Sequence, residues 1–236
     1  MASCLLVVGS EPTARRAVEA LRAAGHDARA HVVIETVPVP DAGAIGAALA
    51  RLPARGLLLF SSPAAVRHAA AALGSALRDR SAGVQGPGTA AEARAAGLEV
   101  AFEAPVHTAE GMFAAIERLA PPPGPGFLLF MAESGRGVLE RGLRKGGYAF
   151  EPLILYRTRE IAPEVREALP PEAPGVVIFT SPSAVRAFLA CERLPDNAAL
   201  VAMGSTTERE LKRAGFVTVR AAGDYSVEGL VRMFES

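Results

Sequence analysis

Short apolar runs alternate along this chain with amphipathic segments that stop at glycine or proline. Runs of this length are typical of buried strands, and the periodic segments between them are typical of helices. Strands are predicted at 5–8, 31–38, 57–60, 83–85, 98–102, 127–130, 153–158, 176–179, 200–203 and 216–220. Helices are predicted at 13–24, 41–52, 63–73, 89–97, 108–119, 137–145, 164–169, from 182, at 207–215 and from 226. This alternation indicates an α/β fold in which helices flank parallel sheets.

One stretch, Val176-Val-Ile-Phe-Thr-Ser-Pro-Ser-Ala-Val-Arg186, combines a buried strand with a helix start. Ser181 is a predicted N-cap, and Pro182 occupies a position where a missing N–H costs nothing. A strand that ends in hydroxyls at a helix N-terminus offers several N–H donors to an anion. The same pattern occurs earlier as Leu57-Leu-Leu-Phe-Ser-Ser-Pro-Ala-Ala-Val-Arg67.

The order of elements repeats at a nearly constant spacing of about 119 residues. The Phe-[Ser/Thr]-Ser-Pro turn recurs, and so does a Gly-x-x-Thr turn that we interpret as a capping box, Thr89 with Glu92 and then Thr207 with Glu210. The pattern predicts two similar lobes from an internal duplication, and composition alone places the division in the proline-rich 121–126 segment. Ligands in such folds bind at the carboxyl ends of strands and between domains, so we expect the site there.

Hydroxyl side chains gather in these strand-to-helix turns. A single serine or threonine at a helix start is ordinarily only a cap, but two such turns in each lobe form a set of donors suited to several carboxylates or phosphates. Arg67 and Arg186 match across the repeat, either as solvated side chains or as anion contacts. The candidate hydroxyls are Ser61, Ser62, Thr89, Thr180, Ser181, Ser183, Thr206 and Thr207.

Composition excludes several classes of function. The 25 basic and 25 acidic residues cancel, which argues against binding to nucleic acid or a membrane surface. Cys4 and Cys191 have no motif spacing, so we expect both to be buried free thiols in a reducing, cytoplasmic setting. The four histidines lack metal-ligand spacing, and no metal is expected. Neither a Gly-x-Ser-x-Gly nucleophile turn nor a Gly-x-Gly-x-x-Gly dinucleotide fingerprint is present.

Tyr156 is one of three tyrosines and lies in Leu155-Tyr-Arg-Thr158, where an extended segment should leave one lobe. It is either an ordinary strand aromatic or, at the edge of a site, a phenol able to donate a proton.

The motifs Phe179-Thr-Ser-Pro-Ser-Ala-Val185, Gly204-Ser-Thr-Thr-Glu-Arg-Glu-Leu211, Gly135-Arg136 and Leu155-Tyr-Arg-Thr158, in this order and spacing, resemble uroporphyrinogen-III synthase. The resemblance covers about residue 5 to residue 234. It implies two α/β lobes joined by a two-stranded β ladder. It also implies different boundaries, with 1–36 plus 158–236 as one lobe and 37–157 as the other, and the proline-rich segment as a loop inside the second.

The resemblance further implies a cofactor-independent enzyme, acting as a cytoplasmic monomer. Its substrate would be hydroxymethylbilane, a linear tetrapyrrole with eight carboxylates, handed over by hydroxymethylbilane synthase. Loss of water and inversion of ring D would yield uroporphyrinogen III, largely through positioning of the substrate. In the family the proton donor corresponds to Tyr156. The implied substrate-binding positions are Ser62, Thr89, Arg136, Thr180, Ser181, Ser183 and Thr207.

The chain departs from the family pattern at two turns. Gly9-Ser10 stands where a Thr-Arg pair is frequent, and Met131-Ala-Glu-Ser134 lacks a basic residue that often precedes the glycine. Two carboxylate partners are therefore absent. These departures keep open a second hypothesis, a tetrapyrrole-binding or regulatory relative without turnover. A third is a two-lobed protein that binds sugar phosphates or another small anion.

Overall fold

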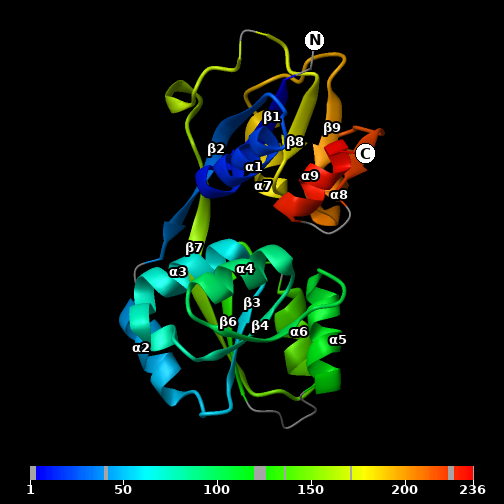
Figure 1. The fold of residues 1–236 in the computed structure, drawn as a ribbon. Helices are drawn as coiled ribbons and strands as arrows, with labels where there is room; N and C mark the ends of the chain where they lie inside the picture. Colours follow the sequence, from blue (N-terminus) through cyan, green and yellow to red (C-terminus); the bar gives the residue numbers. More distant parts are fainter. Residues whose placement is uncertain are drawn as a thin grey trace. The chain divides into compact units, whose positions relative to one another are not determined.

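A computed structural model of the chain describes residues 4–39, 42–119, 126–135, 137–170, 172–222 and 226–235. The chain divides into two compact units (Figure 1). The first unit consists of Met1–Thr36 and Thr158–Ser236, and the second consists of Val37–Arg157. The proline-rich residues 121–125, for which a loop is predicted, lie outside the described part of the chain.

The first unit is built on parallel strands in the order β10-β9-β8-β1-β2. Strands β1, β8 and β9 are short, largely buried apolar runs, as expected for parallel strands that are covered on both faces. The strands are β1 (Leu5–Ser10), β2 (Ala28–Pro38), β8 (Val176–Phe179), β9 (Ala199–Ala202) and β10 (Val219–Ala221). The helices are α1 (Glu11–Ala23), α7 (Pro182–Leu189), α8 (Ser205–Arg213) and α9 (Val227–Glu235), with a 3₁₀ turn at Pro163–Val165.

The second unit has the same kind of sheet, in the order β7-β6-β3-β4-β5, and its neighbouring strands are again parallel. Its strands are β3 (Leu57–Phe60), β4 (Ser81–Val84), β5 (Glu99–Glu103), β6 (Phe127–Ala132) and β7 (Phe150–Glu160). Its helices are α2 (Ala42–Arg51), α3 (Pro63–Leu73), α4 (Pro87–Ala95), α5 (Ala109–Leu119) and α6 (Val138–Lys145), with a 3₁₀ turn at Gly74–Leu77. The predicted α/β fold with parallel strands flanked by helices is therefore confirmed.

Strands β2 and β7 are long, and the boundary between the units falls inside each of them. The two strands are neighbours in the strand order. In the first unit the Ile161 N–H donates to the Val33 carbonyl, and in the second the Val39 N–H donates to the Leu155 carbonyl, both at 2.9 Å. From the first of these hydrogen bonds to the second, the residue number rises from 33 to 39 on the β2 side and falls from 161 to 155 on the β7 side. The two strands therefore run antiparallel.

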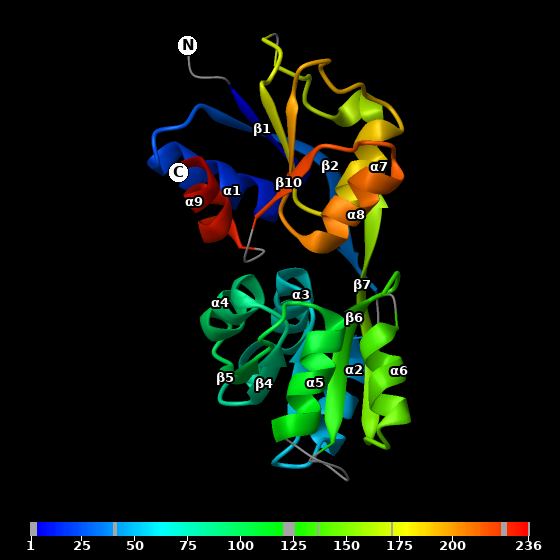
Figure 2. The same ribbon diagram turned by 90° about the vertical axis from the view of Figure 1, so that its right-hand side faces the viewer.

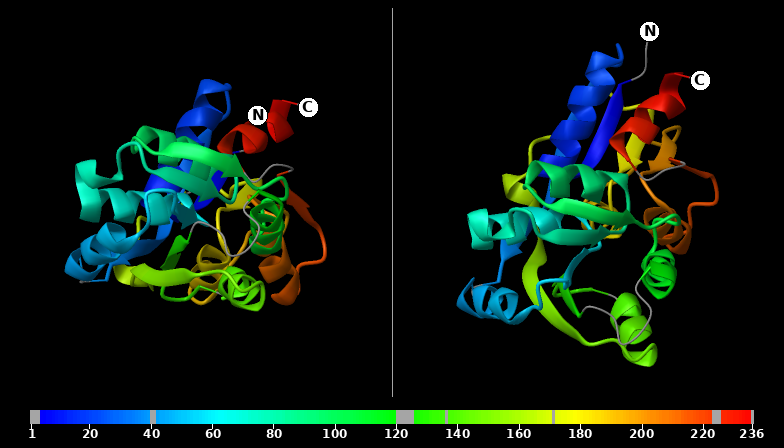
Figure 3. Two further views of the ribbon diagram at one scale, coloured as in Figure 1. Left: turned by 90° about the horizontal axis from the view of Figure 1, so that it is seen from below. Right: turned by 60° about the horizontal axis from the view of Figure 1, so that its bottom comes forward.

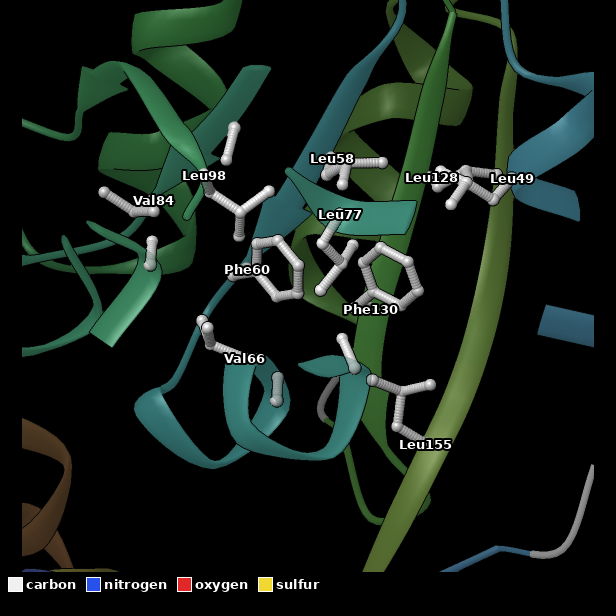
Figure 4. Packing of buried hydrophobic residues seen from close by; sticks show 14 of the residues in the cluster. Leu49, Leu58, Phe60, Val66, Leu77, Val84, Leu98, Leu128, Phe130 and Leu155 are labelled. Atoms are coloured by element: carbon white, nitrogen blue, oxygen red, sulfur yellow. The ribbon is translucent and has the colours of Figure 1, made fainter. Parts of the chain in front are cut away.

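The sheet of the second unit has an apolar core on each face, because successive side chains of a strand point to opposite sides. Phe60 of β3 and Phe130 of β6 lie on the face covered by α2, α3 and α4, with ring centroids 4.8 Å apart and planes 11° from parallel (Figure 4). Leu59, which precedes Phe60 in β3 and pairs with Leu129 of β6, lies on the opposite face against α5 and α6. Those two helices lie side by side (Figure 3).

The first unit repeats this three-layer arrangement. Helices α7 and α8 cover one face of its sheet, where Phe179 and Phe188 meet edge to face at 5.5 Å. Helices α1 and α9 cover the other face and lie side by side (Figure 2). Each unit therefore buries both faces of its sheet and leaves the carboxyl ends of the strands to run into helix starts.

The helix predicted at 164–169 is wrong. Only the 3₁₀ turn Pro163–Val165 forms, and Arg166 follows it in an extended conformation. The Arg166 side chain is only 3% exposed, and its guanidinium donates to the carbonyls of Ile161 and Ala187 and to the carboxylate of Glu192. A buried cation with these partners holds the segment against α7, and a helix would compete with that arrangement.

The expected pair of buried thiols is half correct. Cys4 is buried and immediately precedes β1. Burial is the main cause that raises the pKa of its thiol, and the negative charge of Asp27 adds to it. Cys191 is exposed, because it follows the last turn of α7 on the side away from the sheet core. Both thiols are free.

Candidate functional site

The turn between β3 and α3 shows how the sequence builds the candidate site. Phe60 is the last buried residue of the strand, and Ser62 caps the helix in an extended conformation with Pro63 at the first helical position. Ser62 Oγ accepts a hydrogen bond from the Ala65 N–H at 3.2 Å. The capping role predicted for this serine is therefore present, and its hydroxyl keeps the capacity for a further partner.

Tyr156 supplies that further partner. Its hydroxyl lies 3.0 Å from Ser62 Oγ, although the tyrosine comes from β7. The side chain is 7% exposed. Its ring stacks on the imidazole of His68, with centroids 4.8 Å apart and planes 12° from parallel. The structure thus brings together two residues that the sequence analysis had named for different reasons.

The electrostatics of this cluster favour a protonated phenol. Burial raises the pKa of Tyr156, while the hydrogen bond to Ser62 and the positive charge of Arg67 act in the opposite direction. Burial, with a smaller effect of Arg67, lowers the pKa of His68. At neutral pH the cluster therefore holds a phenol with its proton beside an uncharged imidazole.

The corresponding turn in the first unit has the same cap without a tyrosine. Ser181 Oγ accepts from the Ala184 N–H at 3.2 Å, and Pro182 is the first residue of α7. Ser183, in the first turn of α7, accepts a hydrogen bond from Arg186 at 3.4 Å. Both hydroxyls therefore have partners within their own helix.

Thr180 is tied to the neighbouring strand. Its hydroxyl donates to the Val8 carbonyl at 3.2 Å, and its backbone N–H donates to the same carbonyl at 3.0 Å. A Cβ on Gly9 would lie 2.1 Å from Thr180 Oγ1. Glycine at this departure from the family pattern is therefore required by Thr180, which occupies the space that a side chain would need. The next residue, Ser10, donates to the Thr13 hydroxyl at 3.3 Å.

The two predicted capping boxes are wrong. The N-caps are Gly86 and Gly204, so Thr89 and Thr207 are each the third residue of a helix and are buried. The S/T-x-x-E spacing is present at both places but does not mark a helix start. The N-cap glycine of each helix lies three residues before the threonine. Glu92 and Glu210 instead pair with arginines.

The arginines matched across the repeat both form ion pairs. Arg67 Nη1 lies 2.9 Å from Glu92 Oε2, and Arg186 Nη1 lies 2.9 Å from Glu210 Oε1. Each pair links the two helices whose starts follow neighbouring strands of its unit, α3 with α4 and α7 with α8. Arg186 is nevertheless exposed, as expected for a solvated side chain, whereas Arg67 is partly buried.

The remaining predicted positions are less informative. Arg136 lies outside the described residues. Glu133, in the second turn that departs from the family, bonds through its backbone N–H to the Tyr156 carbonyl at 2.8 Å, so this turn is attached to the tyrosine by the main chain. His68 was missed as a site residue, since nothing in its spacing distinguishes it from a solvated helix residue.

No group of three His, Cys, Asp or Glu side chains within the described ranges is arranged to hold a metal ion. A hollow of about 370 Å³ lies in the first unit against α1 and β2, and Arg15, Glu19, Arg22, Arg29 and Glu167 are among its lining residues. None of the predicted site residues lines it, and its acidic and basic side chains partly cancel. None of the described helices is long and apolar enough to cross a membrane.

Comparisons with known proteins bear on this arrangement. The profile of the uroporphyrinogen-III synthase HemD family matches residues 15–232. No curated protein sequence matches the chain. Among solved structures, uroporphyrinogen-III synthetase from Helicobacter pylori is 20% identical, with a TM-score of 0.63 over 100% of this chain and 99% of that one. A variant of uroporphyrinogen III synthase from the extremely thermophilic bacterium Thermus thermophilus is also 20% identical, with a TM-score of 0.61 over 99% of this chain and 98% of that one.

Proposed function

Because the chain belongs to the uroporphyrinogen-III synthase family, the cyclising lyases of haem biosynthesis, we propose that Tyr156 is its catalytic acid. The substrate is hydroxymethylbilane and the product is uroporphyrinogen III. The observation that carries the assignment is the Tyr156–Ser62 hydrogen bond at the carboxyl end of β3, where parallel α/β sheets place their ligand sites.

The phenol gives its proton to the hydroxyl group that leaves ring A. The carbon–oxygen bond breaks, water departs, and an azafulvene cation remains. Ser62 donates its own hydroxyl proton to the phenolate oxygen, and Arg67 adds a favourable positive charge. Ring D attacks through its substituted carbon, and the resulting spiro intermediate fragments and recloses. The proton lost from carbon when the last pyrrole regains aromaticity restores the phenol, so the protons balance.

The carboxylates of the substrate must be held by hydrogen-bond donors, because the chain has no net positive charge. We assign this role to the strand-to-helix turns, where hydroxyl side chains and backbone N–H groups lie at the N-terminus of a helix, an end that attracts anions. Ser62 is exposed enough in its turn to contact substrate as well as Tyr156, whereas buried Thr89 and Thr207 shape the turns around their backbone donors. The proposed substrate-binding positions are Ser62, Thr89, Arg136, Thr180, Ser181, Ser183 and Thr207.

Matched contacts support an internal duplication, with the two units as lobes 1–36 plus 158–236 and 37–157. Thr108 caps its helix by accepting from the Gly111 N–H at 3.1 Å, and Ser226 accepts from the Gly229 N–H at 2.9 Å. The caps at Ser62 and Ser181 and the two Arg–Glu pairs are further matches. A duplicated scaffold explains why the same polar contact occurs twice.

We further propose that the protein acts in the cytoplasm as a monomer that receives its unstable substrate from hydroxymethylbilane synthase. The two free thiols suit a reducing compartment. Light scattering on the purified protein, with and without the synthase, tests the oligomeric state and the hand-over.

The function is tested by incubating the protein with hydroxymethylbilane and separating the oxidised porphyrin isomers. Uroporphyrinogen III should accumulate faster than spontaneous closure produces the type I isomer. Type I product alone, at the spontaneous rate, would refute the proposal.

A second candidate is a tetrapyrrole-binding relative without turnover, which the missing basic residues near Gly9 and Met131 favour. It predicts binding of uroporphyrinogen III, measured by fluorescence after anaerobic titration, together with no type III formation. Type III formation at a rate above background would remove this candidate.

A further inference from the structure

His68 and Ser62 approach Tyr156 from the same helix. Ser62 caps α3 and His68 lies within it, so both contacts on the tyrosine come from one rigid element. The hydrogen bond fixes the position of the phenol oxygen. The flat contact, with planes 12° from parallel, restricts the tilt of the ring that carries this oxygen.

The scaffold by itself does not require a ring at this position. When the two Phe-[Ser/Thr]-Ser-Pro turns are aligned, the residue matching His68 in the first unit is Ala187, a buried residue of α7. The N-caps and the Arg–Glu pairs occur in both units, whereas an aromatic ring at this helix position occurs only in the second unit, where it stacks on Tyr156. The histidine is therefore present in the unit that contains the proposed acid, and the shared fold does not require it.

We propose that His68 is a positioning residue whose imidazole, stacked on the phenol, keeps the Tyr156 hydroxyl aimed at the leaving group. This inference rests on the proposed role of Tyr156 as the acid. A small loss of alignment at a proton donor lowers the rate of the chemical step, because the reacting atoms spend less time at a productive distance. The uncharged imidazole also adds no positive charge beside the cation formed in the reaction.

The test compares His68→Ala and His68→Phe with Tyr156→Phe by measuring kcat and KM for uroporphyrinogen III formation. His68→Ala should lower kcat by about 10-fold with KM nearly unchanged, because alignment is lost while substrate binding is not. His68→Phe restores a flat ring and should recover kcat to within about threefold of the unmodified protein. Circular dichroism and thermal melting establish that each variant is folded, and His68→Gln replaces His68→Ala if the latter is unstable.

The double variant His68→Ala/Tyr156→Phe identifies the route of the effect. If His68 acts through the phenol, the double variant should be no slower than Tyr156→Phe alone. Multiplying losses would overturn the inference, and so would wild-type kcat in folded His68→Ala or equal losses in the Ala and Phe variants. Unaltered kcat in Tyr156→Phe would instead refute the assignment of the acid, so the two failures are distinguishable.

Discussion

The hydroxyl of Tyr156 lies 3.0 Å from Ser62 Oγ, although 94 residues separate the two in the sequence. Ser62 also accepts from the Ala65 N–H, so one of its lone pairs is already used by the helix cap. Its hydroxyl proton can therefore point to the phenol oxygen and leave the phenol proton for the substrate. One serine thus stabilises a helix start and supports an acid.

Replacing Tyr156 by phenylalanine removes the acid while keeping the ring on His68. We expect kcat for uroporphyrinogen III formation to fall about 100-fold, the typical contribution of a general acid, with KM changed little. Initial rates from isomer analysis provide the measurement. The matched control is Tyr148→Phe, because Tyr148 is a buried tyrosine of the same unit whose hydroxyl has no hydrogen-bond partner in the described part of the chain. Similar rates for both variants would contradict the assignment.

Ser62→Ala and Ser181→Ala remove equivalent caps, each with an Oγ to N distance of 3.2 Å. Each should lower the free energy of unfolding by about 0.5–2 kcal/mol, as measured by urea denaturation. Only Ser62→Ala should also lower kcat, since only Ser62 contacts a tyrosine. Ser181→Ala is expected to raise KM instead. A matched loss of kcat in both would show that capping alone explains the effect.

Gly9→Ala should destabilise the first unit, because the new Cβ would lie 2.1 Å from Thr180 Oγ1. Overpacking of this kind costs about 1–3 kcal/mol in the free energy of unfolding. Thr180→Ala should relieve the clash, so the double variant should lose less stability than the two single variants together. Strictly additive losses in denaturation experiments would mean that the two residues do not interact in this way.

The stability of the protein should depend on the protonation of His68. Its pKa is lowered from the usual 6.5, mainly by burial, so the unfolded chain binds a proton before the folded chain does. Stability therefore falls as the pH drops through 6.5 toward the lowered pKa, and this contribution becomes constant below it. His68→Phe should lack this change, because it removes the imidazole. Parallel urea denaturation at a series of pH values measures the difference, and an identical pH dependence would exclude His68 as its source.

Local rules were sufficient for much of the fold. The strand at 57–60, the cap at Ser62 and the proline after it were predicted because each depends on neighbouring residues only. The same holds for Val176–Phe179 and Ser181. At these positions the apolar run favours a strand, the serine hydroxyl bonds a free helix N–H, and the proline fits the first helical turn. The tertiary structure keeps the conformation that these local preferences predict.

Local patterns failed where two starting points fitted equally well. The S/T-x-x-E spacing at Thr89 predicted a helix start there, but Gly86 followed by Pro87 begins the helix earlier. Thr89 is buried as the third residue of this helix, and burial is a property of the packed unit. The spacing alone contained no information about which of these residues would be buried.

Long-range partners decided the rest. Arg166 lies in a segment predicted to be helical, yet it is buried and pairs with Glu192, which His31 also contacts at 2.8 Å. These three residues are far apart in the sequence. Because an unpaired buried cation is costly, the segment that contains Arg166 takes the backbone conformation in which the guanidinium reaches its partners.

The amino-acid order thus specified where strands end and helices begin, the hydroxyls at those ends, and the family pattern that contains Tyr156. It did not specify that Ser62 would meet Tyr156, that His68 would stack on it, or that Arg67 would be held by Glu92. Caps and turns arise from interactions over three or four residues, which a sequence displays directly. The environment of an acid arises from side chains that only the packing of strands and helices places together.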